Sequence, residues 1–386
     1  MSERPSQRPT IPVGPPAREH HEQLVFTHHT ETHASPRHRL NPETKRRRNE
    51  DRARFDPPTG LGAIIDGTGG EPGGSLAAAT ALEACTSAYL RAHEESPTVS
   101  PEEKRLIEIL TAPASAPQAQ TDVEAAMRQQ LLIADQAVAS LTIQDAHVRR
   151  EAEMFFKESV FYGEQAPQDE KGWASAVQGL SCAAAFYKIW HDAQGDAFAT
   201  VADAGNTRIL VAHEDGTVEY LTREDSLLQA LEDAGLVQQN DETKVIHLKE
   251  AEDAFTQYTK TNAFPSLSVE SALFFLQGKL KKLPTQSLTV REIKKYYEHI
   301  NFQSLGLSRK KNQPSPTPHV KTIKLRSGDR IIAHTDGLDL PLEKLISRLK
   351  RTKDPILLAR SLKLATIKSR AHKTDDITVT VVQGNW

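Results

Sequence analysis

The sequence predicts an α+β sandwich, in which antiparallel strands pack against helices. Apolar segments at residues 182–190, 197–203, 208–213 and 217–221 follow one another through short polar turns such as 214–216. Strands that are joined by turns of this length are antiparallel neighbours. Long helical patterns precede this group and another follows it, whereas a parallel doubly wound sheet needs strands and helices in alternation.

The first third of the chain carries the patterns of two strands and two helices. One strand is expected to start near residues 23–27, and the apolar run at 63–66 is typical of a buried strand. A helix is predicted at residues 76–95. Residues 96–119, which are rich in Pro, Ser and Ala, are expected to form a loop with one short helix.

A long helix is predicted to begin at Thr121, because Thr121 and Glu124 have the spacing of a capping box. The apolar residues of this helix recur at helical spacing and predict a stripe that faces the core. They are Met127, Leu131, Ala134, Val138 and Leu141. A second helix is expected to run to about Val160, and residues 163–172 are expected to be a loop.

The second half of the chain is less regular between residues 240 and 312, where helices are expected at 268–280 and 290–300. A helix is also predicted at 226–234, before this segment. After the segment, strands are predicted at 320–325, 330–335 and 377–382. Pro341 and the pair Asp354-Pro355 are expected to start two further helices, because proline is favoured in the first turn.

Composition limits the function classes. The 386 residues are 38% hydrophobic and 26% charged, and the net charge of −3 gives no general attraction to nucleic acid or an anionic membrane. No apolar run approaches the length of a membrane span. Cys85 and Cys182 lie in apolar segments and are interpreted as core residues of a reducing compartment, so the cytoplasm is the expected location. Residues 1–21, with five prolines, are expected to be a flexible tail.

Acidic residues recur where apolar strands end. Asp66-Gly67 and Asp336-Gly337 each follow an apolar strand, and Asp375-Asp376 precedes the last one. Asp-Gly is also a common turn dipeptide, which is the alternative interpretation of either pair alone. Together, however, these acids are costly unless a cation gathers them, and a carboxylate beside a bare glycine carbonyl suits a hard divalent cation. Glu50-Asp51 is a candidate fourth group. The preceding basic run at residues 45–48 is typical of a solvated face, and the alternative is that one of its arginines binds a phosphoryl group.

Several short motifs then occur in a fixed order along the chain. They are Arg46-x-x-Asn49-Glu50-Asp51, Asp66-Gly67-x-Gly69-Gly70, Gly205-Asn206-Thr207-Arg208, Ser226-Leu227-Leu228, Gly328-Asp329-Arg330, Asp336-Gly337-Leu338 and Asp375-Asp376-Ile377-Thr378. In this order and spacing the sequence resembles the metal-dependent serine/threonine protein phosphatases of the type 2C (PPM) family, as a bacterial-like member. The resemblance covers residues 22–386, which we expect to form one phosphatase domain.

The resemblance implies a four-layer αββα sandwich of two antiparallel sheets flanked by helices, with two Mg²⁺ or Mn²⁺ ions in a cleft at one edge. By this likeness Asp66 bridges the two ions. Asp336 and Asp375 hold one of them, while Glu50 and the Gly67 carbonyl hold the other, directly or through water.

The same resemblance implies roles for three further residues. Asp51 and Asp376 would lie behind the metal ligands, and Arg46 would bind the substrate phosphate. Two such cations lower the pKa of a shared water and stabilise charge on phosphorus during in-line attack. The implied activity is hydrolysis of phosphoserine and phosphothreonine in a phosphorylated protein partner.

The chain departs from the family pattern at several positions. Asn206 stands where the family has a carboxylate, which leaves a third metal open, and Thr68 leaves the general acid unassigned. Glu71 and Ser75 replace a histidine and a glutamate that are common in bacterial members. Asp376 replaces an asparagine and adds negative charge. These departures predict reduced or specialised activity, since every ligand of the two ions is retained.

Three function classes remain open from the sequence. The retained acids favour an active protein phosphatase over a catalytically weak or inactive binding module that keeps the fold. A phosphomonoesterase for a small molecule is a third class, which no residue separates from the first. The segment 240–312 lies where the family carries a variable flap, and we expect it to influence the choice of substrate.

Overall fold

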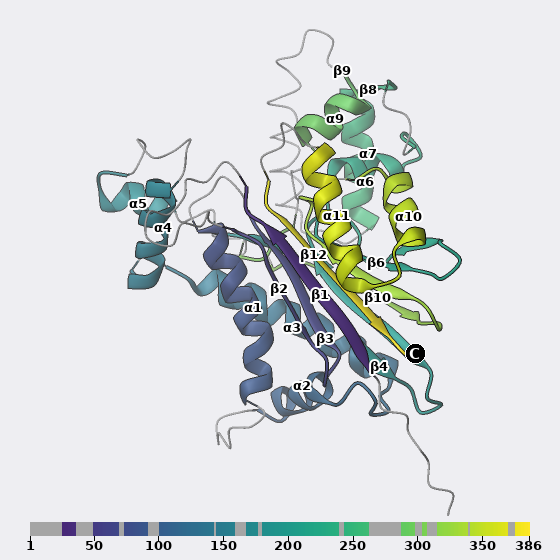
Figure 1. Ribbon diagram of the computed structural model, residues 1–386. Coiled ribbons are helices and arrows are strands. Elements are labelled where there is room, and N and C mark those ends of the chain that lie inside the picture. The colour runs from purple at the N-terminus through teal and green to yellow at the C-terminus, as the bar shows by residue number, and fades with distance from the viewer. Residues whose placement is uncertain are drawn as a thin grey trace, which may run out of the picture.

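The structure is a computed structural model (Figure 1). It describes residues 25–35, 49–68, 73–91, 100–142, 144–158, 167–176, 180–238, 243–261, 287–297, 303–306, 315–338, 340–369 and 375–386. The expected tail at residues 1–21 and the expected helix at 268–280 lie outside these ranges.

Two antiparallel five-stranded sheets form the centre of the molecule. The first sheet has the order β1 (Phe26–His33), β12 (Ile377–Gly384), β11 (Arg330–His334), β6 (Arg208–Ala212) and β7 (Val218–Tyr220). The second has the order β10 (His319–Lys324), β5 (Ala197–Ala204), β4 (Cys182–His191), β3 (Leu61–Gly67) and β2 (Arg52–Asp56). All of these neighbours pair antiparallel, which confirms the predicted class of fold.

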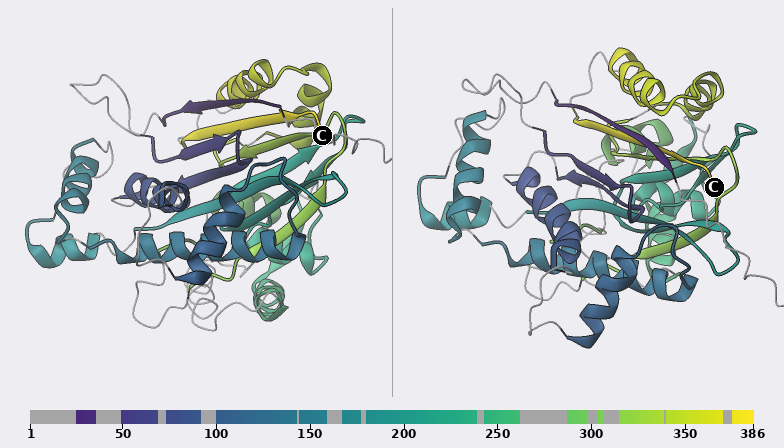
Figure 2. Two further views of the ribbon diagram at one scale, coloured as in Figure 1. Left: turned by 90° about the horizontal axis from the view of Figure 1, so that it is seen from below. Right: turned by 60° about the horizontal axis from the view of Figure 1, so that its bottom comes forward.

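Helices cover both outer faces of the sheet pair, so that the layers run helix, sheet, sheet, helix (Figure 2). The second sheet is covered by α1 (Gly74–Arg91), α2 (Pro101–Thr111) and α3 (Gln120–Ser140). The first sheet is covered by α10 (Leu342–Arg351) and α11 (Pro355–Ser369). The expected four-layer αββα sandwich is thereby confirmed. Among the helices that the structure describes, none is long and apolar enough to cross a membrane.

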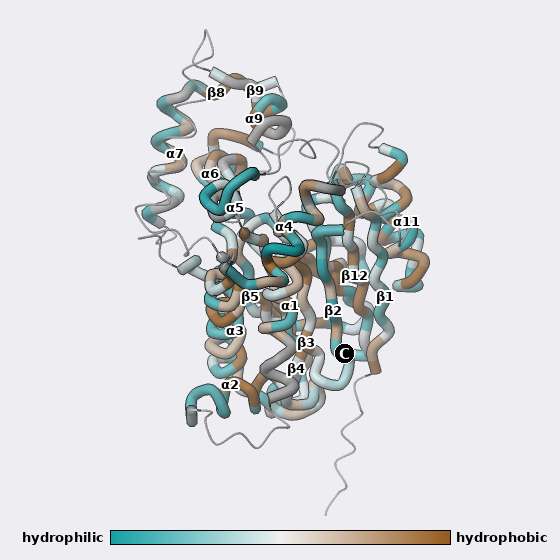
Figure 3. The backbone as a smooth tube through the Cα atoms, turned by 90° about the vertical axis from the view of Figure 1, so that its left-hand side faces the viewer, coloured by the Kyte–Doolittle hydropathy of each residue, from teal (hydrophilic) through white to brown (hydrophobic). Residues whose placement is uncertain are grey.

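The remaining elements lie beside the sandwich. The helices α4 (Ala146–Glu158) and α5 (Glu170–Ala176) pack on each other through Phe156 and Trp173, whose rings meet edge to face. A second group combines α6 (Leu227–Asp233), α7 (Leu248–Thr261) and α9 (Val290–Tyr297) with the antiparallel pair of β8 (Val245–His247) and β9 (Ser287–Thr289). Within this second group α7 is mostly hydrophilic (Figure 3).

Three apolar layers separate the four layers of secondary structure, because alternate residues of each strand point to opposite faces. In β3, Ile65 faces α1 and α3, whereas Ile64 packs between the two sheets. In β12, Val379 faces α10 and α11, whereas Val382 packs between the sheets. Burial of such side chains, at about 25 cal/mol per Å² of apolar surface, is the main stabilising contribution to the sandwich.

Two buried cations join helices to the sheets. Lys188 of β4 is on the face that carries α2, and its Nζ donates to the carbonyls of Thr59 at 2.9 Å and of Leu110 and Ala112 at 3.1 Å. Arg330 of β11 donates to two carbonyls at the end of α10, those of Thr352 and Leu349. The last carbonyls of a helix have no partner within the helix, so each cation supplies the missing donors.

The structure corrects some of the predicted boundaries. The long helix α3 begins at Gln120 after Ala119, which makes no side-chain cap, so the capping box at Thr121 is wrong. Its predicted apolar stripe, by contrast, is buried at every position. The loop predicted up to residue 172 is interrupted by α5, which begins at Glu170. The sequence of this segment did not predict the paired strands β8 and β9 or helix α7.

Candidate functional site

The strand register brings acidic residues together in pairs. In the second sheet β2 pairs with β3 so that Arg52 is opposite Ile65, which places Asp51 beside Asp66. In the first sheet His334 of β11 is opposite Val379 of β12, so Asp336 and Asp375 lie just beyond the same end of that ladder. We call the four residues Asp51, Asp66, Asp336 and Asp375 the acid cluster.

The two pairs meet because the sheets pack face to face. Asp66 is half-buried at the end of β3, yet its carboxyl is enclosed by protein, and burial raises its pKa well above the ordinary value. The charges of Asp51, Asp336 and Asp375 raise that pKa further, and a hydrogen bond joins the side chains of Asp66 and Asp336. Two carboxyl groups in contact must share a proton or gather a cation, since both cannot be ionised cheaply.

Asp51 is buried more deeply, with 4% of its surface exposed. Burial raises its pKa well above the ordinary value, and the charges of Asp376 and Asp375 act in the same direction. The hydroxyl of Thr335 opposes this shift by donating to Asp51 Oδ2 at 2.8 Å. The same hydroxyl accepts the backbone N–H of Thr378 at 3.0 Å, so β11 and β12 together fix the orientation of Asp51.

Asp376 has a different environment from the cluster beside it. It is buried, and its two carboxylate oxygens accept the backbone N–H groups of Ser35 and Glu50, each at 2.5 Å. One side chain therefore ties the residues after β1 and the residues before β2 to the start of β12. An asparagine would offer only one acceptor oxygen to these two donors. The two backbone N–H groups therefore explain why an aspartate stands at this position.

Asn206 contacts the cluster directly. Its Nδ2 donates to Asp336 Oδ2 at 3.0 Å. Asp225 fixes the loop that carries Asn206, because Asp225 Oδ2 accepts the backbone N–H of Gly205 at 2.9 Å. Burial raises the pKa of Asp225 to about 8. The amide of Asn206 thus acts as a hydrogen-bond donor that positions Asp336.

Two glycines allow the backbone segments at the site to approach one another. A Cβ on Gly67 would lie 2.3 Å from the carbonyl oxygen of Gly74 and 2.9 Å from that of Glu50. A Cβ on Gly337 would lie 1.6 Å from the carbonyl oxygen of Asp376. All three distances are below any real Cβ contact, so close packing at this end of the sandwich requires glycine after Asp66 and after Asp336.

The other predicted site residues are placed as follows. Glu50 is fully buried next to Asp51, and its backbone N–H contacts Asp376 as described above. Gly67 is the last residue of β3. Arg46, the predicted phosphate ligand, lies outside the described ranges. Thr68, at the position left without a general acid, hydrogen-bonds through its hydroxyl to that of Ser181 at 2.7 Å.

Sequence reasoning missed several residues that position the acids. Besides Thr335 and Asn206, the guanidinium of Arg52 donates to the carbonyls of Asn49 and Asp51 and to the hydroxyl of Ser75. Arg52 thereby fixes the segment that carries Glu50 to the start of α1. The sequence could have indicated Arg52 and Thr335, because each of them is the direct neighbour of a candidate acid.

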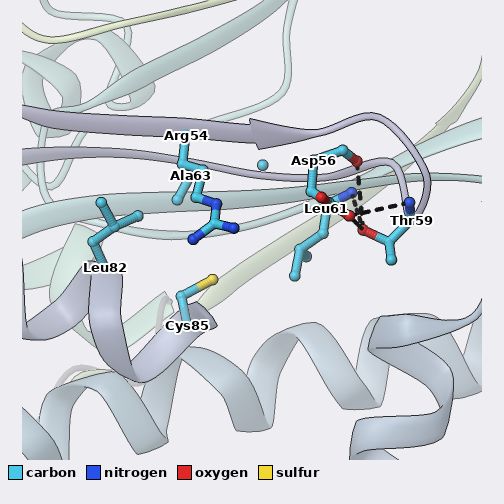
Figure 4. Close-up of a pocket in the computed structure, with 8 residues that line it drawn as sticks. Arg54, Asp56, Thr59, Leu61, Ala63, Leu82 and Cys85 are labelled. Carbon is cyan, nitrogen blue, oxygen red and sulfur yellow. Dashed lines mark hydrogen bonds between the residues drawn. The ribbon is translucent and has the colours of Figure 1, made fainter. Parts of the chain in front are cut away.

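A small cavity lies near the other end of β3 (Figure 4). It has room for about one water molecule, about 20 Å³, between the β2–β3 hairpin and α1. The hairpin is closed there by a hydrogen bond from the Thr59 hydroxyl to Asp56 Oδ2 at 2.6 Å. Burial raises the pKa of the Cys85 thiol in its wall to about 12, so this thiol is not a nucleophile near neutral pH. The cavity is a packing gap and not a second site.

Comparison with solved structures identifies the fold. The catalytic domain of the serine/threonine protein phosphatase PstP, solved in complex with two manganese ions, matches with a TM-score of 0.50 and 16% identity over 94% of this chain and 99% of that one. Stp1, a serine/threonine phosphatase from Staphylococcus aureus, matches with a TM-score of 0.51 and 11% identity over 93% and 94%. The sequence matches no protein-family model and no curated protein.

A bacterial serine phosphatase matches with a TM-score of 0.50 and 12% identity over 94% of this chain and 98% of its own. The fold is therefore that of the bacterial type 2C (PPM) serine/threonine phosphatases, as the motifs of the sequence predict. At these identities the likeness defines the fold, and the chemistry must be argued from the residues of this chain.

The residues of the acid cluster suit a hard divalent cation in their chemistry and charge. All of them are oxygen donors, and the mutual repulsion that raises the pKa of Asp66 is the repulsion that a cation relieves. Within the described ranges, no three His, Cys, Asp or Glu side chains are grouped closely enough to enclose one metal ion. The carboxyls of Asp66 and Asp336 instead hydrogen-bond to each other.

Proposed function

We propose that this chain is a metal-dependent phosphatase that hydrolyses phosphoserine and phosphothreonine in proteins. The observation that carries the proposal is the acid cluster, in which four carboxyl groups from both sheets converge at one end of the sandwich. Like charges at this density cost stability, so a purely structural descendant of the fold has no reason to keep them. The fold is shared with serine/threonine phosphatases, one of which was solved with two manganese ions.

The proposed ligands of two Mg²⁺ or Mn²⁺ ions are Asp66, Asp336, Asp375, Glu50 and the carbonyl of Gly67. When bound, such ions lower the pKa of water and stabilise negative charge on a phosphoryl group. The packing of Gly67 against the carbonyl oxygens of Glu50 and Gly74 brings the backbone of β3 close to that of Glu50.

Three further side chains have supporting roles in this proposal. Asp51, oriented by the Thr335 hydroxyl, accepts protons or hydrogen bonds from water at the site. Asp376 keeps Glu50 in place, because its carboxylate accepts the backbone N–H of Glu50. Arg46 binds the phosphate of the substrate through a planar guanidinium that matches two phosphate oxygens.

The proposal extends to domain organisation and location. Residues 22–386 would form one phosphatase domain, in which the segment 240–312 influences the choice of protein substrate. Comparing phosphopeptide hydrolysis with and without that segment tests this role. Both cysteines, Cys85 and Cys182, are buried free thiols, which agrees with a reducing compartment such as the cytoplasm.

The test is hydrolysis of an aryl phosphate and of phosphopeptides with Mn²⁺ or Mg²⁺, with a chelator, and by the variant Asp336→Asn. We expect activity that requires metal and is lost in Asp336→Asn, while the exposed control Glu108→Gln on α2 keeps it. Metal-independent hydrolysis, or a fully active Asp336→Asn protein, contradicts the proposal. A folded chain that hydrolyses neither substrate with either metal supports the binding module instead.

A further inference from the structure

The outer layer formed by α10 and α11 has a charge opposite to that of the whole chain. Residues 341–369 contain eight Lys and Arg but only two Asp and Glu, while the complete chain has a net charge of −3. We call the outer surface of α10, α11 and the residues that connect them the basic layer. A surface of one sign on a chain of the other sign attracts molecules of complementary charge.

Most of this positive charge is available to a partner. Five basic residues of the layer are exposed and make no ion pair within the described part of the chain, namely Lys344, Lys350, Arg351, Lys353 and Lys368. By contrast, Arg360 and Lys363 both bind the carboxylate of Glu31 on β1, so their charges are partly neutralised and serve to hold α11 on the sheet.

Exposed apolar side chains lie on the same layer. Ile356, Leu357 and Leu364 of α11 are 37%, 58% and 52% exposed, and only Val25 and Val245 are comparable large hydrophobic residues elsewhere in the described ranges. Leu357 and Leu364 are two turns apart and therefore share one face of the helix. Hydrophobic and hydrophilic residues accordingly alternate along α11 (Figure 3). These three side chains add exposed apolar surface to the basic layer.

The basic layer adjoins the acid cluster at one end. Helix α10 begins at Leu342, shortly after Asp336, and α11 ends at Ser369, shortly before Asp375. Lys344 and Lys368 are therefore at the end of the layer that is nearest the cluster, whereas Arg351 and Lys353 are at the far end. A chain that lies along α10 and α11 would therefore have one end on the side where these helices connect to Asp336 and Asp375.

We propose that the basic layer binds an acidic protein segment that also carries apolar side chains. If the proposed function holds, that segment belongs to the phosphoprotein substrate and places its phosphorylated residue near the acid cluster. The charge of the layer and its exposed aliphatic residues match the two kinds of side chain in such a segment. The layer lacks the Trp, Tyr and Phe residues that anchor proteins at a lipid surface, which favours a protein over an anionic membrane.

The test measures binding directly and does not depend on phosphatase activity. A fluorescein-labelled, unphosphorylated peptide of mixed Asp, Glu and Leu is titrated with the full chain, and binding is followed by fluorescence anisotropy at low and high salt. The test variant combines Lys344→Gln, Arg351→Gln, Lys353→Gln and Lys368→Gln. We expect it to bind about tenfold more weakly than the unmodified chain, with a smaller dependence on salt.

A matched control removes the same charge elsewhere. It combines Lys104→Gln, Arg128→Gln, Lys171→Gln and Lys249→Gln, all of them exposed residues on other helices. Binding unchanged in the control and weakened in the test variant supports the basic layer as the docking surface. Equal weakening in both variants, no binding of the peptide, or binding only to anionic vesicles overturns it. Because the peptide carries no phosphate, the binding result can be interpreted even if the chain has no phosphatase activity.

Discussion

Two groups of buried charged residues in this molecule have opposite environments. In the acid cluster, like charges are crowded together and burial raises the pKa of Asp51 and Asp66. At Lys188 and Arg330, a single buried cation is surrounded by backbone carbonyls and has no like charge among those contacts. The first arrangement costs stability, whereas the second supplies donors to carbonyls that would otherwise lack them.

The comparison separates residues that serve the site from residues that serve the fold. A buried cation that caps a helix is explained completely by the contacts that it makes. A group of mutually repelling carboxyls is not explained by its contacts, and its cost is understandable only if a cation or a proton binds there. Three substitutions test this difference, because neutralising the two kinds of group should have opposite effects on stability.

The largest effect is expected for Asp66→Asn. Hydrolysis of an aryl phosphate should fall by about a hundredfold or more, since Asp66 loses its negative charge and one of its two carboxylate oxygens. The free energy of unfolding in the presence of a chelator should stay level or rise by up to about 1 kcal/mol, because one repelling charge is removed. Urea denaturation together with steady-state kinetics measures both quantities. A strongly destabilised Asp66→Asn protein would show that the cluster is structural.

Arg330→Met should have a smaller effect on activity and the opposite effect on stability. The variant keeps an apolar stem but leaves the carbonyls of Leu349 and Thr352 without their donor. We expect the free energy of unfolding to fall by about 3 kcal/mol, as for other buried charges whose contacts are broken. Urea denaturation of Lys104→Met, an exposed residue of α2, provides the control. An unchanged unfolding midpoint in Arg330→Met would exclude the anchoring role.

The smallest effect at neutral pH is expected for Lys188→Met, and its signature is a pH dependence. Burial lowers the pKa of Lys188 from 10.5 to about 7, while the negative charge of Asp56 opposes that change. Between these two values the unfolded chain binds more protons than the folded chain. The contribution of Lys188 to stability therefore increases as pH rises through this window, by at most about 1.4 kcal/mol per unit.

The measurement is the free energy of unfolding of the original chain and of Lys188→Met across that pH range. The difference in the free energy of unfolding between these two proteins should grow with pH. For Arg330→Met, the difference from the original chain should stay constant over the same pH range. If the curves of the original chain and Lys188→Met run parallel, the buried ammonium keeps an ordinary pKa, and the two anchors are equivalent.

The sequence contained most of the information on the strands and on the acids, for a physical reason. An apolar run followed by Asp-Gly indicates a buried strand whose end lies close to another backbone segment. Asp66 and Asp336 could therefore be predicted to lie at strand ends. Lys188 was also visible, as one charge within the apolar run 182–190, but its partners come from a distant helix and loop. Long-range partners leave no pattern in the local sequence.

The predictions that were wrong or missing also concern features that leave no pattern in the local sequence. The start of α3 was misplaced because the helix continues back to Gln120, and no side-chain cap marks its beginning. The strands β8 and β9 pair although α7 separates them in the chain, and each has only three residues, which is too short to show a periodicity. Asn206 was noticed as a departure from the family, yet its role as a donor to Asp336 needed the structure.

The pairing of β1 with β12 has a consequence for the time at which the site is assembled on the ribosome. Phe26 is opposite Gly384, and the backbone N–H of Ser35 reaches Asp376, so neither β1 nor the segment behind Glu50 has its partner until residue 384 has been made. At about 5–20 residues per second this delay is on the order of tens of seconds. A nascent chain thus carries Asp66 long before it carries Asp375. If the proposed function holds, a nascent chain without β12 lacks one of the proposed metal ligands and should be inactive.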